Sequence, residues 1–336
     1  MDASVIIPTY NAEKIIKPVI NALLSQQTKK TFEIIVVDDG SSDETAQEVK
    51  KIKSKKLVYL HQKNTGPAKA RNAGAKCAKG KIILFIDSDC VAEKAWLTEM
   101  LKPFSEKGGA AVQGAYKTKQ KELIARLDQI DIEYRYEKMK KAQENNSLDW
   151  VGSYSAAYDK KIYDSLGGFD ESFPIASGED PELSYKVQEK GGKIIFNPKA
   201  IVYHTHPSKL GKYLRIKFFR AFYRPKMYSK HKGKILKDSY TPQSLKLQIF
   251  AAYFSIWVIV LLIIGVLTGW QNVPEFFPSI AIWSLIIAIM LTGLSQTSFF
   301  GFAIKKDWKV AVCSIPILAL RGLVFGTGLI WGKLRG

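Results

Sequence analysis

The sequence predicts an α/β domain with a mixed, mostly parallel sheet, followed by an amphipathic interface helix and an α-helical transmembrane region. Three observations lead to this prediction. Apolar runs typical of buried strands alternate with helical patterns in residues 1–207, which is the arrangement of a parallel sheet with right-handed crossovers. Basic and apolar residues then share a helical spacing within residues 208–246. Long, almost uncharged segments occupy residues 247–336.

The composition favours anionic partners. The chain has 336 residues, with 50 Lys and Arg against 31 Asp and Glu, so a membrane surface or a phosphate-bearing substrate is expected. Its three cysteines, Cys77, Cys90 and Cys313, are scattered, which indicates neither a disulfide framework nor metal-ligand spacing and favours a reducing compartment. The first residues lead directly into a strand, so we expect no signal peptide.

The central strand is expected at residues 82–86, an unbroken apolar run typical of a strand buried on both faces. It ends at Asp87 and Asp89. In parallel sheets ligands bind beyond the carboxyl ends of the strands. Carboxylates two residues apart in a tight turn can bind one hard cation, and that cation can hold a diphosphate. A solvated acidic turn is the alternative, because Asp and Ser are common in turns.

The remaining elements of the first half are predicted in order. We expect further strands at residues 4–8, 32–37 and 57–60, and helices at residues 12–26 and from residues 44 and 66. The second strand also ends in carboxylates, Asp38 and Asp39. Two acidic turns should therefore lie at the same edge of the sheet.

Four motifs in this region, residues 5–11, 36–43, 66–74 and 87–89, resemble the successive signatures of family 2 glycosyltransferases. The resemblance implies the GT-A fold, whose Rossmann-like sheet binds a nucleotide. It also implies that Asp39 faces the base or ribose and that Asp89, with Asp87 beside it, holds a metal ion and the sugar diphosphate. The nucleotide-sugar-binding residues expected on this basis are Pro8, Thr9, Tyr10, Asn11, Asp38, Asp39, Lys69, Arg71, Asp87 and Ser88.

Two later motifs, residues 167–171 and 178–183, resemble the acceptor-side loop of the family and its Glu-Asp motif at the start of a helix. The resemblance implies that Asp180 is the general base that accepts the proton of the acceptor hydroxyl. Glu179 is the alternative for this role. Outside the family pattern, a carboxylate here is more simply a helix cap or a favourable partner of the helix dipole.

A third metal ligand is expected after the closing strands, which we place at residues 194–196 and 200–203. By resemblance to metal-dependent GT-A enzymes this ligand is His204, with His206 as the alternative. The cofactor is then Mn²⁺ or Mg²⁺, and an imidazole ligand suits Mn²⁺ better.

A basic amphipathic helix is expected from Lys209, because apolar residues recur every four positions among lysines and arginines. This pattern is typical of a helix lying on an anionic membrane surface. Nucleic-acid binding is the rival interpretation, and the apolar segments that follow argue against it. We expect Arg220 or Arg224 to contact phosphate of the donor or of a lipid acceptor, with plain membrane adhesion as the alternative.

Two or three transmembrane helices are expected, at residues 247–270, at 278–294 with a possible extension to 300, and at 310–331. The third segment contains Pro316 and Arg321, and a charge in the bilayer marks a paired or functional position, or a segment that does not span. Its small residues Gly322, Gly326 and Gly328 permit close helix packing.

The basic residues predict a cytoplasmic catalytic domain on a multi-pass protein of the cell membrane. Residues 305–309 belong on the cytoplasmic side, and residues 271–277, without Lys or Arg, on the outside. Three spans leave the basic tail 333–335 outside, against the same rule. The alternative that the third segment is re-entrant and does not span the membrane therefore remains.

The resulting functional prediction is an inverting, metal-dependent glycosyltransferase. It moves a single sugar, with mannose favoured, from a GDP- or UDP-linked donor to a polyprenyl- or dolichyl-linked saccharide at the cytoplasmic membrane face. It is similar to the single-addition mannosyltransferases of lipid-linked oligosaccharide assembly, with a minimal cellulose-synthase-like architecture. The alternatives are a polyprenyl-phosphate sugar synthase, a polysaccharide synthase and a sugar-nucleotide-binding scaffold without turnover. The Gln-x-x-Arg-Trp motif of processive synthases is missing from the sequence, which argues against polymer synthesis. Asp89 and Asp180 argue against a scaffold, since binding alone needs no base.

Overall fold

The computed structural model describes residues 1–235, 238–269 and 276–335. Contacts within the chain divide it into two units. The sheet unit comprises Met1–Lys121, Tyr136–His206 and Met227–Tyr240, and the helical unit comprises Glu122–Arg135, Pro207–Lys226 and Thr241–Gly336. The interface segment expected at residues 208–246 is thus shared between the units. Most of the loop expected outside the membrane, residues 271–277, lies beyond the described residues.

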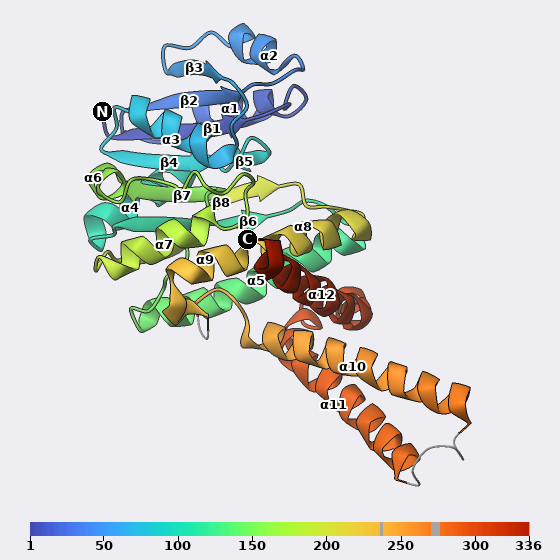
Figure 1. Cartoon of the computed structure of the whole chain (residues 1–336). Helices are drawn as coiled ribbons and strands as arrows, with labels where there is room; N and C mark the ends of the chain where they lie inside the picture. The colour runs from blue at the N-terminus through green and yellow to red at the C-terminus, as the bar shows by residue number, and fades with distance from the viewer. Residues whose placement is uncertain (236–237, 270–275, 336) are drawn as a thin grey trace. The chain divides into compact units, whose positions relative to one another are not determined.

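An eight-stranded sheet with the order β3-β2-β1-β4-β7-β6-β8-β5 forms the sheet unit (Figure 1). The strands are β1 Ala3–Thr9, β2 Phe32–Asp39, β3 Leu57–Gln62, β4 Ile82–Ile86, β5 Cys90–Ala92, β6 Ala111–Lys117, β7 Ser155–Asp159 and β8 Ile194–His204. β3, β2, β1 and β4 pair in parallel, as do β6 and β8. β7 is antiparallel to β4 and β6, and β5 to β8. The predicted mixed, mostly parallel α/β sheet is confirmed.

The strands that the sequence predicts are those with continuous apolar runs. Consecutive residues of β1, Val5, Ile6 and Ile7, are fully buried, as expected for a strand covered on both faces. β6 and β7 were not predicted, because they consist largely of Ala, Ser, Gly and polar residues. The two closing strands expected after residue 194 are one strand, β8, whose pairing with β6 shifts register between Gln113 and Ala115.

The helices of the sheet unit place the loops at the carboxyl edge of the sheet. They are α1 Ile16–Leu24, α2 Thr45–Lys51, α3 Pro67–Cys77, α4 Trp96–Glu106, α6 Lys160–Ser165 and α7 Glu179–Glu189, while α5 Leu123–Glu144 and α9 Arg224–Lys230 contribute to both units. A short 3₁₀ helix, Lys232–Lys234, follows α9. α3 packs very close to the sheet, since a Cβ on Gly74 would lie 2.5 Å from Ile6 Cγ2. This approach brings the buried Arg71 to the strand ends.

Among its described residues, the helical unit contains three helices long and apolar enough to cross a membrane. They are α10, Gln243–Thr268; α11, Phe277–Ala303, with the apolar span Pro278–Ala303; and α12, Trp308–Arg335. α12 is continuous, with Pro316 inside it. α8, Leu210–Phe222, belongs to the same unit and buries Tyr213, Lys217 and Ala221.

The charge in the third apolar segment is paired. Arg321 donates to Asp131 Oδ1 at 3.0 Å and to Gln248 Oε1 at 2.7 Å, and Asp131 also accepts from Arg135 at 2.8 Å. The predicted close packing at Gly322 is confirmed, since a Cβ there would lie 2.8 Å from the carbonyl oxygen of Gln248. α10 and α12 therefore meet at a small residue next to a buried polar contact.

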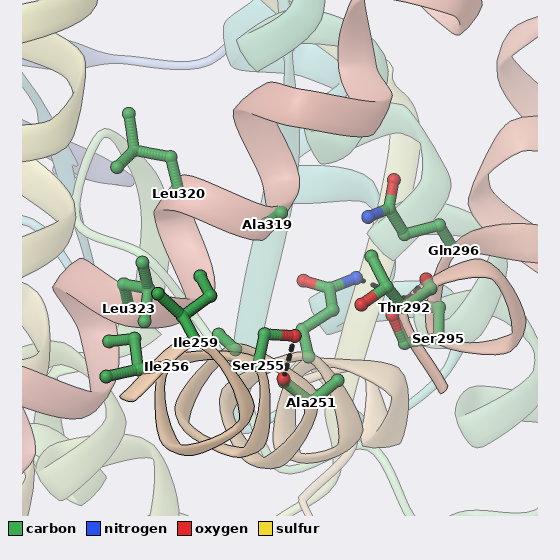
Figure 2. A pocket seen from close by; sticks show the side chains of 12 residues that line it. Ala251, Ser255, Ile256, Ile259, Thr292, Ser295, Gln296, Ala319, Leu320 and Leu323 are labelled. Carbon is green, nitrogen blue, oxygen red and sulfur yellow. Dashed lines mark hydrogen bonds between the residues drawn. The ribbon is translucent and has the colours of Figure 1, made fainter. Parts of the chain in front are cut away.

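A cavity of about 210 Å³ lies within the helical unit (Figure 2). It is lined by α10, α11 and α12 and is mainly apolar, with Leu320, Leu323 and Ile259 among its walls. Several polar groups at its border bond to the helix backbone: Ser255 donates to the carbonyl of Ala251 at 2.8 Å, and Gln248 to that of Ser295 at 3.2 Å.

Candidate active site

A cavity of about 450 Å³ opens at the carboxyl ends of β1, β2 and β4. Its walls include the turn after β1, the start of α3, the acidic turn after β4 and residues 174–176 of the loop before α7. Seven of the ten expected nucleotide-sugar-binding residues line it: Pro8, Thr9, Tyr10, Asp39, Arg71, Asp87 and Ser88. Asp89 lines it as well. The parallel register of the three strands brings these residues together from distant parts of the sequence.

The other three expected residues lie behind or beside the cavity. Asp38 is buried and accepts hydrogen bonds from Tyr59 Oη at 2.6 Å and from the backbone N–H of Ser41 at 2.9 Å. Asn11 joins the turn after β1 to the loop after β2, because its Oδ1 accepts from the backbone N–H of Ser42 at 2.9 Å. Lys69 is exposed on α3. The hydrogen bonds of Asp38 and Asn11 hold the loops after β1 and β2 in place.

The carboxylate of Asp39 accepts hydrogen bonds mainly from the loop before α3. Its Oδ1 accepts from Gln62 Nε2 at 2.7 Å and from the backbone N–H of Thr65 at 2.9 Å, and its Oδ2 from the backbone N–H of Gly66 at 2.8 Å. A carboxylate has about four acceptor positions. Oδ2 therefore keeps acceptor capacity for a donor group in the cavity.

Arg71 connects the acidic turn to the start of α7. Its side chain is buried and donates to Asp87 Oδ1 at 3.1 Å and to Glu179 Oε1 at 2.9 Å. Arg71 Nε is buried and has no hydrogen-bond partner among the described residues. A buried donor without a partner is costly, so this N–H is a candidate contact for an anionic group in the cavity.

The acidic turn after β4 has the donor atoms for a divalent cation. Ligand atoms of Asp87, Asp89 and Cys90 lie within 4.8 Å of one another, and His204 Nε2 lies 3.3 Å from Asp89 Oδ2. Burial raises the pKa of the Cys90 thiol well above its usual value, so the thiol is a poor ligand at neutral pH. Two carboxylates and an imidazole remain, and this set fits Mn²⁺, with Mg²⁺ as the harder alternative.

The two carboxylates of the turn differ in their electrostatic environment. Burial raises the pKa of Asp87 above its ordinary value, although Arg71 acts in the opposite direction. Burial also acts to raise the pKa of Asp89, but hydrogen bonds, chiefly the one from His204, outweigh it, and the net pKa is lowered. Asp89 is thus the carboxylate held more firmly in its ionised form.

Glu179 and Asp180 have different partners. Both carboxylate oxygens of Glu179 have partners: its Oε1 accepts from Arg71, and its Oε2 accepts from the backbone N–H groups of Ser177 and Gly178 at 2.8 and 3.0 Å. Asp180 uses only Oδ2, which accepts from the backbone N–H of Ser153 at 3.1 Å. Asp180 Oδ1 is buried without a partner among the described residues.

The environment of Asp180 suits a proton acceptor. Burial, followed by the neighbouring charge of Glu179, raises the pKa of Asp180 to about 7. A carboxylate with a pKa near the working pH is an effective general base. Of the two candidates, Asp180 is therefore the one with a carboxylate oxygen that has no partner among the described residues, and neither candidate is among the residues that line the cavity.

Residues 4–167 match the profile of glycosyl transferase family 2. The chain contains a family 2 glycosyltransferase domain. The poly(ribitol-phosphate) beta-N-acetylglucosaminyltransferase TarS of Staphylococcus aureus (strain Mu50) is 45% identical over 103 residues, which is 30% of this chain and 18% of TarS. The chondroitin synthase of Pasteurella multocida (strain Pm70) is 26% identical over 237 residues, which is 61% of this chain and 25% of that synthase. The matched segments thus span a quarter or less of these two relatives.

The fold is similar to that of solved GT-A structures. The mannosyltransferase PcManGT from Pyrobaculum calidifontis, solved with GDP-Man and Mn²⁺, has a TM-score of 0.62 and 16% identity, and the match covers 98% of this chain and 87% of that one. At this identity the likeness shows the fold alone. It confirms the GT-A fold that the motifs of the family 2 domain predicted.

One well-connected residue of the family 2 domain has no role in the sequence-based prediction. Asn72 is buried and accepts from Tyr163 Oη at 2.6 Å and from the backbone N–H of Phe169 at 2.9 Å, and it donates to the Phe169 carbonyl at 2.9 Å. It therefore ties α3 to the loop that leads to the cavity wall and α7. Its place directly after Arg71 was the available signal, because the motif 66–74 already marked this helix.

The two arginines expected to contact phosphate lie in the helical unit. Arg224 donates to Thr241 Oγ1 at 3.1 Å, and its guanidinium lies 5.2 Å from the ring centroid of Phe325. Arg220 is exposed on α8. Arg224 thus has packing partners within its own unit, whereas Arg220 presents its charge to the surroundings.

Proposed function

We propose that the protein is an inverting, metal-dependent glycosyltransferase that adds one sugar to a lipid-linked saccharide. The acceptor hydroxyl oxygen attacks the anomeric carbon from the face opposite the leaving group. Its proton passes to Asp180 Oδ1, and the bond between the anomeric carbon and the phosphate oxygen breaks with its electron pair on the nucleotide diphosphate. One displacement of this kind inverts the anomeric configuration.

The observation that carries the proposal is the state of Asp180. It has a buried carboxylate oxygen without a partner among the described residues and a pKa raised to about 7. A purely structural carboxylate is normally satisfied by hydrogen bonds, as Glu179 is. The position of Asp180 at the start of α7, beside the residue that binds Arg71, supports a role next to the donor.

The cavity residues are assigned to donor binding. Pro8, Thr9 and Tyr10 form the wall on which the nucleotide lies, and Asp39 Oδ2 accepts a hydrogen bond from the base or ribose. Arg71 Nε donates to the diphosphate. Asp89, Asp87 and His204 hold Mn²⁺ or Mg²⁺, which when bound neutralises negative charge on the departing nucleotide diphosphate.

The donor and acceptor are inferred from the membrane region and from similar proteins. Three helices of suitable length and composition and the basic helix α8 support an acceptor that resides in the membrane, with the active site on the cytoplasmic face. PcManGT is a mannosyltransferase that was solved with GDP-Man, and mannose from a GDP- or UDP-linked donor is our first choice. A polyprenyl- or dolichyl-linked saccharide is the proposed acceptor.

The test compares transfer and donor binding in the full-length protein in detergent. Asp180→Asn keeps the shape of the side chain and removes the base, so turnover should fall by roughly 10²–10⁴-fold while the affinity for the nucleotide sugar stays near that of the wild type. The matched control is Asp164→Asn, the same change at an exposed side chain of α6. If Asp180→Asn keeps the turnover of the wild type and Glu179→Gln loses it, the general base is Glu179 and not Asp180.

Two alternatives give different products. A polyprenyl-phosphate sugar synthase would glycosylate the bare lipid phosphate. A polysaccharide synthase would give a ladder of products, and the similarity to chondroitin synthase is the reason to test this alternative. Mass spectrometry of the lipid fraction separates both from a single addition.

A further inference from the structure

The two histidines after β8 contact each other through the same ring nitrogen. His204 Nδ1 lies 3.1 Å from His206 Nδ1, while His204 Nε2 lies 3.3 Å from Asp89 Oδ2. His206 is buried. His204 thus has one nitrogen at the proposed cation ligands and the other at His206.

A hydrogen bond between two Nδ1 atoms allows only one of them to carry the proton. If His206 Nδ1 is the donor, neutral His204 is protonated at Nε2, and that N–H donates to Asp89. If His204 Nδ1 is the donor, its Nε2 has a lone pair that points to the Asp89 carboxylate. Two acceptors facing each other are unfavourable without a cation between them, and they are the required arrangement when a cation is bound.

We propose that His206 is a positioning residue that holds His204 in the Nδ1–H tautomer when a divalent cation is bound at Asp89. Both imidazoles change tautomer on cation binding. His204 gives up the Nε2 proton and receives the Nδ1 proton of His206, and His206 takes a proton at Nε2, so the pair binds the same number of protons before and after. The inference rests on the proposed function only in placing a cation at this site.

The backbone of His206 is held by hydrogen bonds, and its ring packs against an aromatic neighbour. The backbone N–H of His206 donates to Gln120 Oε1 at 2.6 Å, and Gln120 Nε2 donates to the His206 carbonyl at 3.0 Å. Tyr116 stacks on His204 with the ring centroids 4.6 Å apart and meets His206 edge-on at 5.8 Å. A phenyl ring at position 206 should therefore keep the backbone and the packing while removing the hydrogen bond.

The first measurement is the affinity of the full-length protein for Mn²⁺, from the EPR signal of the free ion. His206→Phe leaves the His204 Nδ1–H without an acceptor, and we expect a loss of about 10- to 100-fold, typical when the hydrogen-bond partner of a metal-bound histidine is removed. His206→Asn can supply an amide oxygen near the position of Nδ1 and should recover most of the affinity. Equal affinity of wild type and His206→Phe, with normal thermal unfolding of both, would overturn the inference and leave the proposed reaction intact.

The second measurement reads the tautomers directly by ¹⁵N NMR of histidine-labelled protein. The chain has four histidines, so the spectrum is simple, and His206→Asn and His204→Ala assign the two signals. Adding Cd²⁺, a diamagnetic divalent ion, should convert His204 from Nε2–H to Nδ1–H and His206 from Nδ1–H to Nε2–H. A change at His204 alone would contradict the coupled exchange. Failure of the wild type to bind either ion would overturn the cation site and the inference together, even if transfer activity were present.

Discussion

Replacing Asp180 by asparagine should stabilise the folded protein at pH 8, although the same change should strongly lower turnover. The pKa of Asp180 is raised from its ordinary 3.8 to about 7 by burial and by the charge of Glu179. For a carboxyl group whose pKa is higher in the folded state than in the unfolded state, the contribution to stability is fully present at pH values below the unfolded-state pKa. This contribution is lost as the pH rises from about 4 through 7. Above pH 7 the wild type therefore bears the cost of a buried, ionised Asp180.

The magnitude follows from the shift. About three pKa units at roughly 1.36 kcal/mol each give about 4 kcal/mol as the upper limit at pH 8. The side chain of Asp180 keeps partial contact with solvent, which screens the charge, so we expect about 2 kcal/mol. Because 1 kcal/mol corresponds to roughly 2–4 °C for a domain of about 200 residues, Asp180→Asn should unfold some 4–8 °C above the wild type.

The assay is thermal unfolding of wild type and variant in detergent at pH 5 and pH 8, without added metal. The difference in midpoint should be small at pH 5 and largest at pH 8. Asp164→Asn, on the surface of α6, is the control and should show neither effect. If Asp180→Asn is no more stable than the wild type at pH 8, or is equally stabilised at pH 5, the reasoning about its ionisation is refuted.

Three further predictions concern the cation, the basic helix and the acceptor-side loop. Asp89→Ala should remove transfer and cation-dependent donor binding, and undiminished wild-type turnover in EDTA would contradict the cation site. Arg220→Ala should lower turnover on a phosphate-bearing acceptor. Arg224→Ala should mainly lower the unfolding temperature, because Arg224 packs within the helical unit. Unchanged turnover in both variants would indicate that α8 serves only in membrane adhesion. Gly168→Ala should cost about 1–3 kcal/mol of stability, because Gly168 has a φ of 72° and a Cβ there would lie 2.6 Å from Asn72 Oδ1; calorimetry showing no loss would refute the tight packing of this loop.

The first half of the fold was predictable because its strands are buried on both faces. The apolar runs of β1, β2 and β4 can be recognised without knowledge of their neighbours. β6 and β7 are not predicted from the sequence because these neighbouring antiparallel strands pack closely and need small residues: a Cβ on Gly114 would lie 2.1 Å from Ser155 Oγ. That requirement becomes visible only when the two strands are seen side by side.

The candidate site was predictable as a set of motifs but not as a set of contacts. The sequence placed Glu179 and Asp180 together and left the base open between them. Their hydrogen bonds separate the two, because Arg71 and two backbone amides engage Glu179 while Asp180 keeps an oxygen without a partner among the described residues. Partners 108 residues apart in the chain, as Arg71 and Glu179 are, cannot be inferred from local spacing.

In the membrane region too, the sequence predicted the elements but not the contacts between them. Length and composition predicted two or three long helices, and the described residues contain three. The partner of Arg321 required tertiary structure, because Asp131 lies 190 residues earlier in the sequence. The orientation of the helices in the bilayer stays a prediction from the distribution of basic residues.

The most direct test of the proposed function is the mass and anomeric configuration of the lipid product. The full-length protein in detergent would receive lipid-linked saccharide acceptors, a divalent cation and, in turn, GDP-mannose and UDP-linked sugars. We predict one added sugar per acceptor, bonded with the anomeric configuration opposite to that of the donor, and formation of this product roughly 10²–10⁴-fold more slowly by Asp180→Asn. A retained configuration, a polymer ladder, or no transfer from any of these donors would contradict the proposal of a single-addition, inverting glycosyltransferase.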